Sequence, residues 1–109
     1  TLKTIILKQL EDNGKMYGYE ITQKVKDLTE GHLELREGAL YPTLHKLEAD
    51  GLVITEKIFI GKRVRKYYTL TPKGNEATIS KIEEFVGFMN MMQSLLGIQN
   101  ISIQKREQR

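Results

Sequence analysis

The hydrophobic pattern of this chain changes at Gly51, and that change limits the folds available to it. Before Gly51, apolar residues recur at helical spacing in three segments, residues 2–13, 18–29 and 37–50. After Gly51 come two runs rich in β-branched and aromatic side chains, separated by a glycine-containing turn. The runs are residues 52–60 and 65–71, and the turn is residues 61–64. The chain is therefore predicted to form three helices followed by a β-hairpin.

The third predicted helix contains Pro42, which restricts where that helix can begin. Proline in a helix interior costs about 3 kcal/mol, so we expect the helix to start at Gly38 or Ala39 with Pro42 in its first turn. The apolar stripe of this helix is Leu40, Leu44 and Leu47. That stripe is expected to face the core.

A long helix is predicted from Pro72 to about Leu96, with Thr71 as its N-cap and proline at its first position. Its apolar residues occur around most of its girth, whereas one buried stripe needs only three or four per two turns. Such a helix must contact more than one neighbour. We expect its own domain on one side and a second copy of the chain on the other.

The positive charge of the chain is concentrated in one short segment. The formal net charge is +3, but residues 57–66 contain five basic residues and no acidic residue. The remaining residues are slightly acidic, with 12 basic against 14 acidic side chains. A basic patch on a near-neutral body is typical of an element that contacts phosphates, and a solvated hairpin tip is the alternative interpretation.

Three helices followed by a hairpin is the layout of a winged helix-turn-helix, a mainly α fold in which the third helix enters the major groove. With the leucine stripe buried, the opposite face of that helix carries short polar, aromatic and basic groups. These residues are Tyr41, Thr43, His45, Lys46 and Ala49. They can contact phosphates or base edges, and an ordinary solvated face is the alternative. This face has no Arg, Asn or Gln for a bidentate base contact.

The hairpin would be the wing. Its turn places Lys62 and Arg63 at the tip, and Arg65 and Lys66 at the start of the returning strand. Contact with phosphates or with the minor groove is the functional interpretation, to which Lys57 would add if it points the same way.

Four stretches of the sequence resemble a PadR-family transcriptional regulator of the short kind, with one winged helix and one C-terminal helix. They are Tyr17-Gly-Tyr-Glu-Ile21, Gly38-Ala-Leu-Tyr-Pro-Thr-Leu44, Leu47-Glu-Ala-Asp-Gly-Leu52 and Arg65-Lys-Tyr-Tyr-Thr-Leu-Thr-Pro-Lys-Gly74. Together they span nearly all of residues 1–97 in the expected order. The resemblance implies a repressor that binds double-stranded DNA as a homodimer.

The resemblance also assigns residues to roles. The DNA-binding residues would be Tyr17, Tyr19, Tyr41, Pro42, Thr43, His45, Lys46, Lys62, Arg63 and Arg65. The dimer interface would combine the last helix with the first, through Leu2, Ile5, Ile6, Ile82, Phe85, Val86, Met89, Met92 and Leu96. The domains would be a winged helix at 1–71, a dimerisation helix at 72–98 and a polar, flexible tail at 99–109.

Some PadR-family members bind small aromatic effectors between their dimerisation helices. The residues that could line such a pocket here are Phe85, Phe88, Met89 and Met92. Methionine adapts to varied ligands, but Met and Phe at helical spacing more often form a packed interface. The chain also lacks Trp, which supplies the stacking ring in multidrug-responsive members.

Other functions have less support in the sequence. We expect no catalytic residues, metal site or cofactor, because metal-binding and nucleophile motifs are absent and His32 and His45 lie far apart. No apolar run is long enough to span a membrane. The lack of cysteine is compatible with a reducing cytoplasm, the location that we expect. The alternatives are a winged helix that binds protein and a stand-alone dimeric effector-binding protein.

Overall fold

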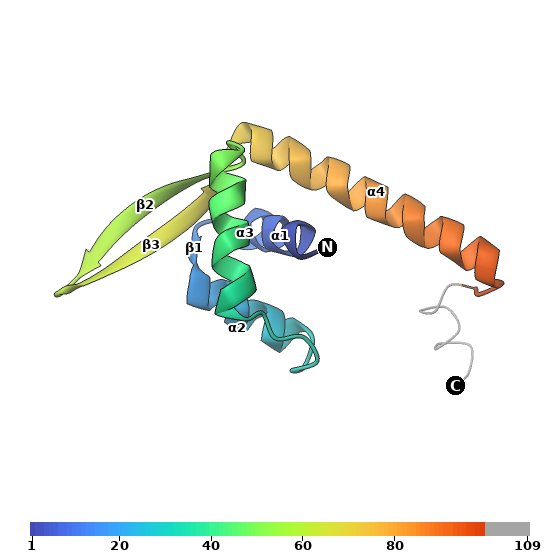
Figure 1. Ribbon diagram of the computed structural model, residues 1–109, viewed down its shortest axis with the longest axis horizontal. Coiled ribbons are helices and arrows are strands. Elements are labelled where there is room, and N and C mark those ends of the chain that lie inside the picture. Colours follow the sequence, from blue (N-terminus) through green and yellow to red (C-terminus); the bar gives the residue numbers. More distant parts are fainter. Residues whose placement is uncertain (100–109) are drawn as a thin grey trace. The chain divides into compact units, whose positions relative to one another are not determined.

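The computed structural model describes residues 1–99, and the expected order of elements is confirmed (Figure 1). The elements are α1 (Leu2–Asn13), β1 (Met16–Tyr17), α2 (Gly18–Leu28), α3 (Glu37–Ala49), β2 (Val53–Ile60), β3 (Arg63–Leu70) and α4 (Pro72–Leu96). Residues 100–109 of the expected tail lie outside the described residues. Within residues 1–99, none of the helices combines the length and apolar character needed to cross a membrane.

The chain divides into two compact units, Thr1–Ile79 and the residues from Ser80 onward. The first two turns of α4 belong to the first unit, where Gly74 and Thr78 are buried. This compact unit therefore includes residues beyond 71, where we expect the winged helix to end.

The core of the first unit lies between α1, α2, α3 and the inner ends of the strands. Its buried members are Ile6, Leu7, Leu10, Met16, Ile21, Leu40, Leu44, Leu47, Leu52, Val53 and Tyr68. The leucine stripe of α3 is confirmed as core. Burial of the Tyr68 ring raises the pKa of its phenol above the ordinary value of 10.0, because the phenolate would lose its water.

One residue expected at the dimer interface lies in the core, and one apolar residue of α2 lies outside the core. Ile6, expected at the dimer interface, is completely buried in the core of its own protomer, so that assignment is wrong. It has no surface with which to contact a partner. Leu28 shares the helical spacing of Ile21 and Val25 but is 66% exposed, because it is the last residue of α2 and lies beyond the core.

The sheet has three antiparallel strands in the order β1-β3-β2. β1 was not predicted, because two residues are too few to show an alternating pattern. It pairs Met16 with Tyr68 and Tyr17 with Tyr67. The hairpin turn is also shorter than expected: Ile60 pairs with Arg63, which leaves only Gly61 and Lys62 between the strands. Gly61 has a φ of 63°, the positive value that such tight turns need at their first position.

α3 begins at Glu37, one residue before the earliest expected start, so Pro42 lies in its second turn. The first backbone bonds run from the N–H groups of Ala39 and Leu40 to the carbonyl of Arg36. Pro42 cannot donate to the carbonyl of Gly38, and Gly38 is exposed, so water can satisfy that oxygen.

One hydroxyl joins the hairpin, α3 and α4. Thr71 accepts a hydrogen bond from the N–H of Gly74 and donates one to the carbonyl of Gly51, at 3.0 and 2.7 Å. The expected N-cap of α4 is therefore confirmed. Gly74 approaches the backbone of Leu52 so closely that a Cβ would lie 3.0 Å from its carbonyl carbon, which only glycine allows.

Candidate nucleic-acid interface

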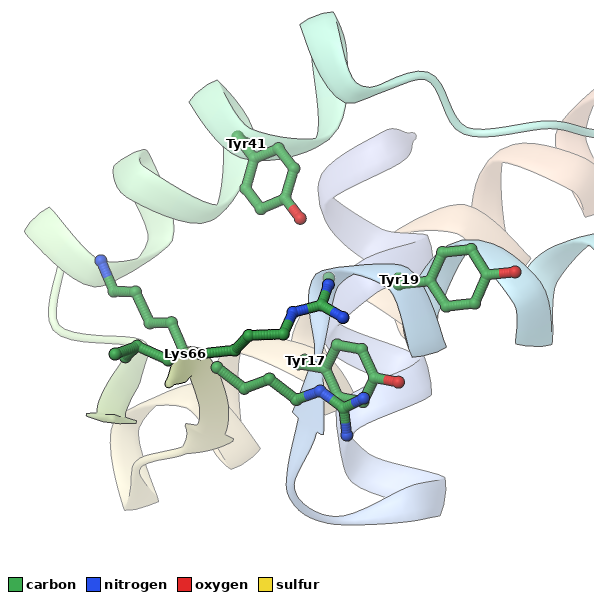
Figure 2. A pocket seen from close by; sticks show the side chains of 8 residues that line it. Tyr17, Tyr19, Tyr41 and Lys66 are labelled. Atoms are coloured by element: carbon green, nitrogen blue, oxygen red, sulfur yellow. The ribbon is translucent and has the colours of Figure 1, made fainter. Parts of the chain in front are cut away.

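An open cleft of about 600 Å³ separates the start of α2 and the exposed face of α3 from the hairpin (Figure 2). Its lining comes from three segments that are distant in the sequence and combines the aromatic rings of β1, α2 and α3 with the cations of β3. The lining residues are Tyr17, Gly18, Tyr19, Tyr41, Arg63, Val64, Arg65 and Lys66. Five of these were predicted to bind DNA: Tyr17, Tyr19, Tyr41, Arg63 and Arg65. The fold brings them together.

The upper wall of the cleft depends on a contact between α3 and α2. The Tyr41 ring lies against the backbone of Gly18, where a Cβ would come within 2.8 and 2.9 Å of two ring carbons. Such distances are shorter than real carbon contacts, so the ring occupies the space that a side chain would need. Glycine at the first position of α2 therefore fixes how close the two helices of the helix-turn-helix approach.

The floor of the cleft is a stack of three side chains. The guanidinium of Arg65 lies 4.4 Å from the centre of the Tyr17 ring, a cation–π geometry. Tyr67 packs edge-on against the same ring, with 5.3 Å between ring centres. Tyr67 next to Arg65 raises the pKa of the guanidinium, which is charged at neutral pH. The Tyr17 ring thus lines the cleft and also holds the Arg65 guanidinium there.

The outer wall and rim carry the remaining cations. Tyr19 is 62% exposed and points away from the stack of Tyr17 and Arg65 (Figure 2). Lys66 lies on the α3 side, 3.7 Å from a carboxylate oxygen of Glu48. Among the ion pairs formed within residues 1–99, none involves Lys62 or Arg63. These two side chains are free to pair with an external anion.

The exposed face of α3 carries further residues that do not line the cleft. Pro42, His45 and Lys46 are exposed, and Thr43 is half-buried. The hydroxyl of Thr43 donates to the carbonyl of Ala39 at 2.8 Å, so only its lone pairs face outward. Lys46 forms an exposed ion pair with Asp50 at 3.4 Å, which is weak enough to exchange for a phosphate at little cost.

Sequence reasoning missed two parts of the cleft. Gly18 carries no side chain, and only the ring of Tyr41, folded against it, shows why it is needed. Val64 was assigned to the turn, whereas the two-residue turn places it on β3, among the residues that line the cleft. The tyrosines of the motif around Gly18 were the only signal that could have marked this position.

Comparison with known proteins identifies a family that matches most of this chain. Residues 6–80 match the model of the transcriptional regulator PadR-like family. A curated transcriptional regulator of Mycobacterium tuberculosis, Rv3488, is 40% identical over 72 residues. That alignment covers 66% of this chain and 64% of the regulator, so it spans less than two thirds of the relative's length.

Solved structures show the same fold. A PadR family transcriptional regulator from Eggerthella lenta superposes with a TM-score of 0.79 at 27% identity, over 88% of this chain and 81% of its own. The structure of Bacillus subtilis PadR in complex with operator DNA matches with a TM-score of 0.67 at 29% identity. That match covers 74% of this chain and 45% of the Bacillus protein.

The contact between Gly18 and Tyr41 can be tested by a double-mutant cycle on stability. In the wild-type background, Gly18→Ala should lower the free energy of unfolding, because the new methyl group displaces the Tyr41 ring. In a Tyr41→Ala background the same change should be neutral or stabilising, because alanine favours a helix over glycine by about 1 kcal/mol. Denaturant unfolding should therefore give a coupling of about 1 kcal/mol or more. Equal effects in both backgrounds would rule out the contact.

Proposed function

The chain belongs to the PadR-like family of transcriptional regulators, and we propose that it represses transcription by binding a palindromic operator as a homodimer. Members of this family are DNA-binding regulators rather than enzymes. The observation that carries the proposal is the cleft of tyrosines and arginines beside the exposed face of α3. Within one compact unit, an exposed helix that can enter the major groove thus lies next to a surface lined by cations.

Each part of the cleft would meet a different part of the duplex. α3 would lie in the major groove, with Thr43, His45 and Lys46 near base edges and phosphates. Tyr17, Tyr19 and Tyr41 would approach the sugar-phosphate backbone at the groove edge, where Arg65 is already held by the Tyr17 ring. The structure of Bacillus subtilis PadR in complex with operator DNA supports DNA as the partner.

The lack of Arg, Asn and Gln among the exposed residues 41–46 of α3 affects how sequence would be read. These side chains make the bidentate contacts that distinguish bases most strongly. Recognition by this chain would therefore depend on single contacts from α3 and on the shape of the duplex. Affinity would come mainly from phosphate contacts and would fall steeply with salt.

Dimerisation is proposed from the apolar surface of α4. Large apolar side chains that are 45% to 71% exposed recur along its second half: Phe85, Val86, Phe88, Met89, Met91, Leu95 and Leu96. Soluble monomers rarely leave so many apolar groups together in water. Burial of this surface by a second copy would place two α3 helices on one face of the duplex, about one helical turn or 34 Å apart. Leu2 and Ile5, half-buried on α1, would complete the interface with Ile82 and Met92.

A second hypothesis, an effector-binding role, rests on Phe85, Phe88, Met89 and Met92. All four lie on α4, and the first three are exposed, so a pocket would need walls from outside this helix. Burial of these four residues by a second copy would explain their apolar character without a ligand. Release of the repressor by a small aromatic molecule therefore remains a prediction of the family resemblance. The protein-binding alternative is disfavoured, because it gives no reason for cations at the tip of the hairpin that form no ion pair within residues 1–99.

The wing is tested by the double substitution Lys62→Ala with Arg63→Ala. Binding to operator and to random DNA should weaken alike, because phosphate contacts carry no sequence information. The slope of log affinity against log salt should flatten by about 0.9 for each lost phosphate contact. Fluorescence anisotropy with both duplexes at several salt concentrations measures both effects. The control Lys3→Ala with Lys8→Ala on α1 changes the net charge by the same amount and should leave the salt slope unaltered. Equal salt slopes for the two variants would show that the wing does not contact DNA.

The dimer is tested by placing a charge within the apolar surface of α4. Met89→Asp should yield monomers, because an aspartate buried between two copies would have no partner, and operator binding should weaken by tenfold or more. Sedimentation velocity measures the assembly directly. Asn90→Asp adds the same charge at an exposed polar position of the same helix and should remain dimeric. An intact Met89→Asp dimer would exclude this residue from the interface.

A further inference from the structure

The hairpin has a second exposed face, whose apolar residues the proposed contacts do not use. Val64 and Lys66 of this face also line the edge of the cleft. Directly paired residues of β2 and β3 share a face, and successive pairs alternate between faces. Arg63, Arg65 and Tyr67 lie on the face that carries Tyr17. The opposite face carries the pairs Thr55–Tyr68, Lys57–Lys66 and Phe59–Val64. We call this second surface the apolar wing face.

The inner end of the apolar wing face belongs to the core and adjoins α3. Tyr68 is buried there, and the hydroxyl of Thr55 donates to a carboxylate oxygen of Glu48 on α3 at 3.0 Å. The other carboxylate oxygen of Glu48 lies 3.7 Å from Lys66, one pair further out. The apolar wing face is thus continuous with the helix that we place in the major groove.

The outer end of this face is apolar and open to solvent. Phe59 is 75% exposed and Val64 is 49% exposed, and they face each other across the two strands. A phenyl ring at the end of a hairpin gains nothing from the fold in that position. Together with Val64 it forms an exposed apolar pair that contact with a partner would remove from water.

The charges around this pair identify the kind of surface that would cover it. Lys57 and Lys66 lie directly opposite each other one pair inward, an arrangement of like charges that destabilises a hairpin. Glu48 offsets only Lys66, and none of the ion pairs within residues 1–99 involves Lys57. Lys62 lies at the outer end. A partner that compensates these cations must be anionic on both sides of an apolar strip.

We propose that Phe59 and Val64 form an apolar contact with the deoxyribose walls of the DNA minor groove, beside the major groove that α3 enters. Sugars line that groove between two rows of phosphates, which matches an apolar pair bracketed by lysines. Proteins that bind the minor groove often place Phe and aliphatic side chains in it, in many cases as wedges between base steps. This inference rests on the proposed function, and it assigns to Phe59 a role in affinity that does not depend on charge.

The test compares Phe59→Ala with Ile60→Ala, a neighbour of similar apolar character on the opposite face of the hairpin. Phe59→Ala should weaken operator binding about tenfold, equivalent to about 1.4 kcal/mol. Its salt slope should equal that of the wild type, because no phosphate contact is lost. Ile60→Ala should bind within about twofold of the wild type. Since Phe59 is largely exposed, circular dichroism should show both variants folded.

Hydroxyl-radical footprinting gives a readout specific to the groove, because the radical attacks deoxyribose from the minor-groove side. Wild-type protein and Ile60→Ala should protect sugars flanking the α3 contacts, and Phe59→Ala should lose protection there alone. Unchanged affinity and protection for Phe59→Ala would overturn the inference and leave the proposed function intact. A flattened salt slope would also overturn it, since the effect would then come from displaced cations. Failure of the wild-type protein to bind any duplex would instead reject the proposed function itself.

Discussion

Burial of Tyr68 in the core anchors the strand on which the functional surfaces depend. Its ring is only 1% exposed, and its backbone lies between Met16 of β1 and Thr55 of β2. With the inner end of β3 fixed in this way, strict alternation sets the direction of every residue further out. Arg63 and Arg65 are directed to the Tyr17 side, and Val64 and Lys66 to the other. A one-residue slip in register would exchange the two faces.

The helix-turn-helix is set by a second constraint, the absence of a side chain at Gly18. The Tyr41 ring fills that space, so the distance between α2 and α3 is fixed by a ring lying on backbone. The same approach brings Tyr17 to the cleft, where its ring holds the Arg65 guanidinium at 4.4 Å. Packing and electrostatics meet here, because Gly18, which sets the position of α3, directly follows Tyr17, which holds a cation beside it.

The sequence predicted the elements better than their details. Periods of 3.6 and 2 residues located the four helices and the hairpin, and Thr71-Pro72 marked the start of α4. The pattern could not reveal β1, whose two residues have no period, or the two-residue turn, since Val64 is compatible with turn or strand. Ile6 was misassigned because helical spacing identifies an apolar face of a helix. It does not show whether the core of the chain or a partner covers that face. The cleft itself required the fold, since its walls come from three separated segments.

We propose that two copies of this chain present two α3 helices to one duplex. Selection of bound sequences from random DNA with the purified protein tests it most directly. We expect an inverted repeat whose half-sites are centred one helical turn apart, about 10 base pairs. A single unpaired half-site, or no enrichment over the starting pool in low salt, would contradict it.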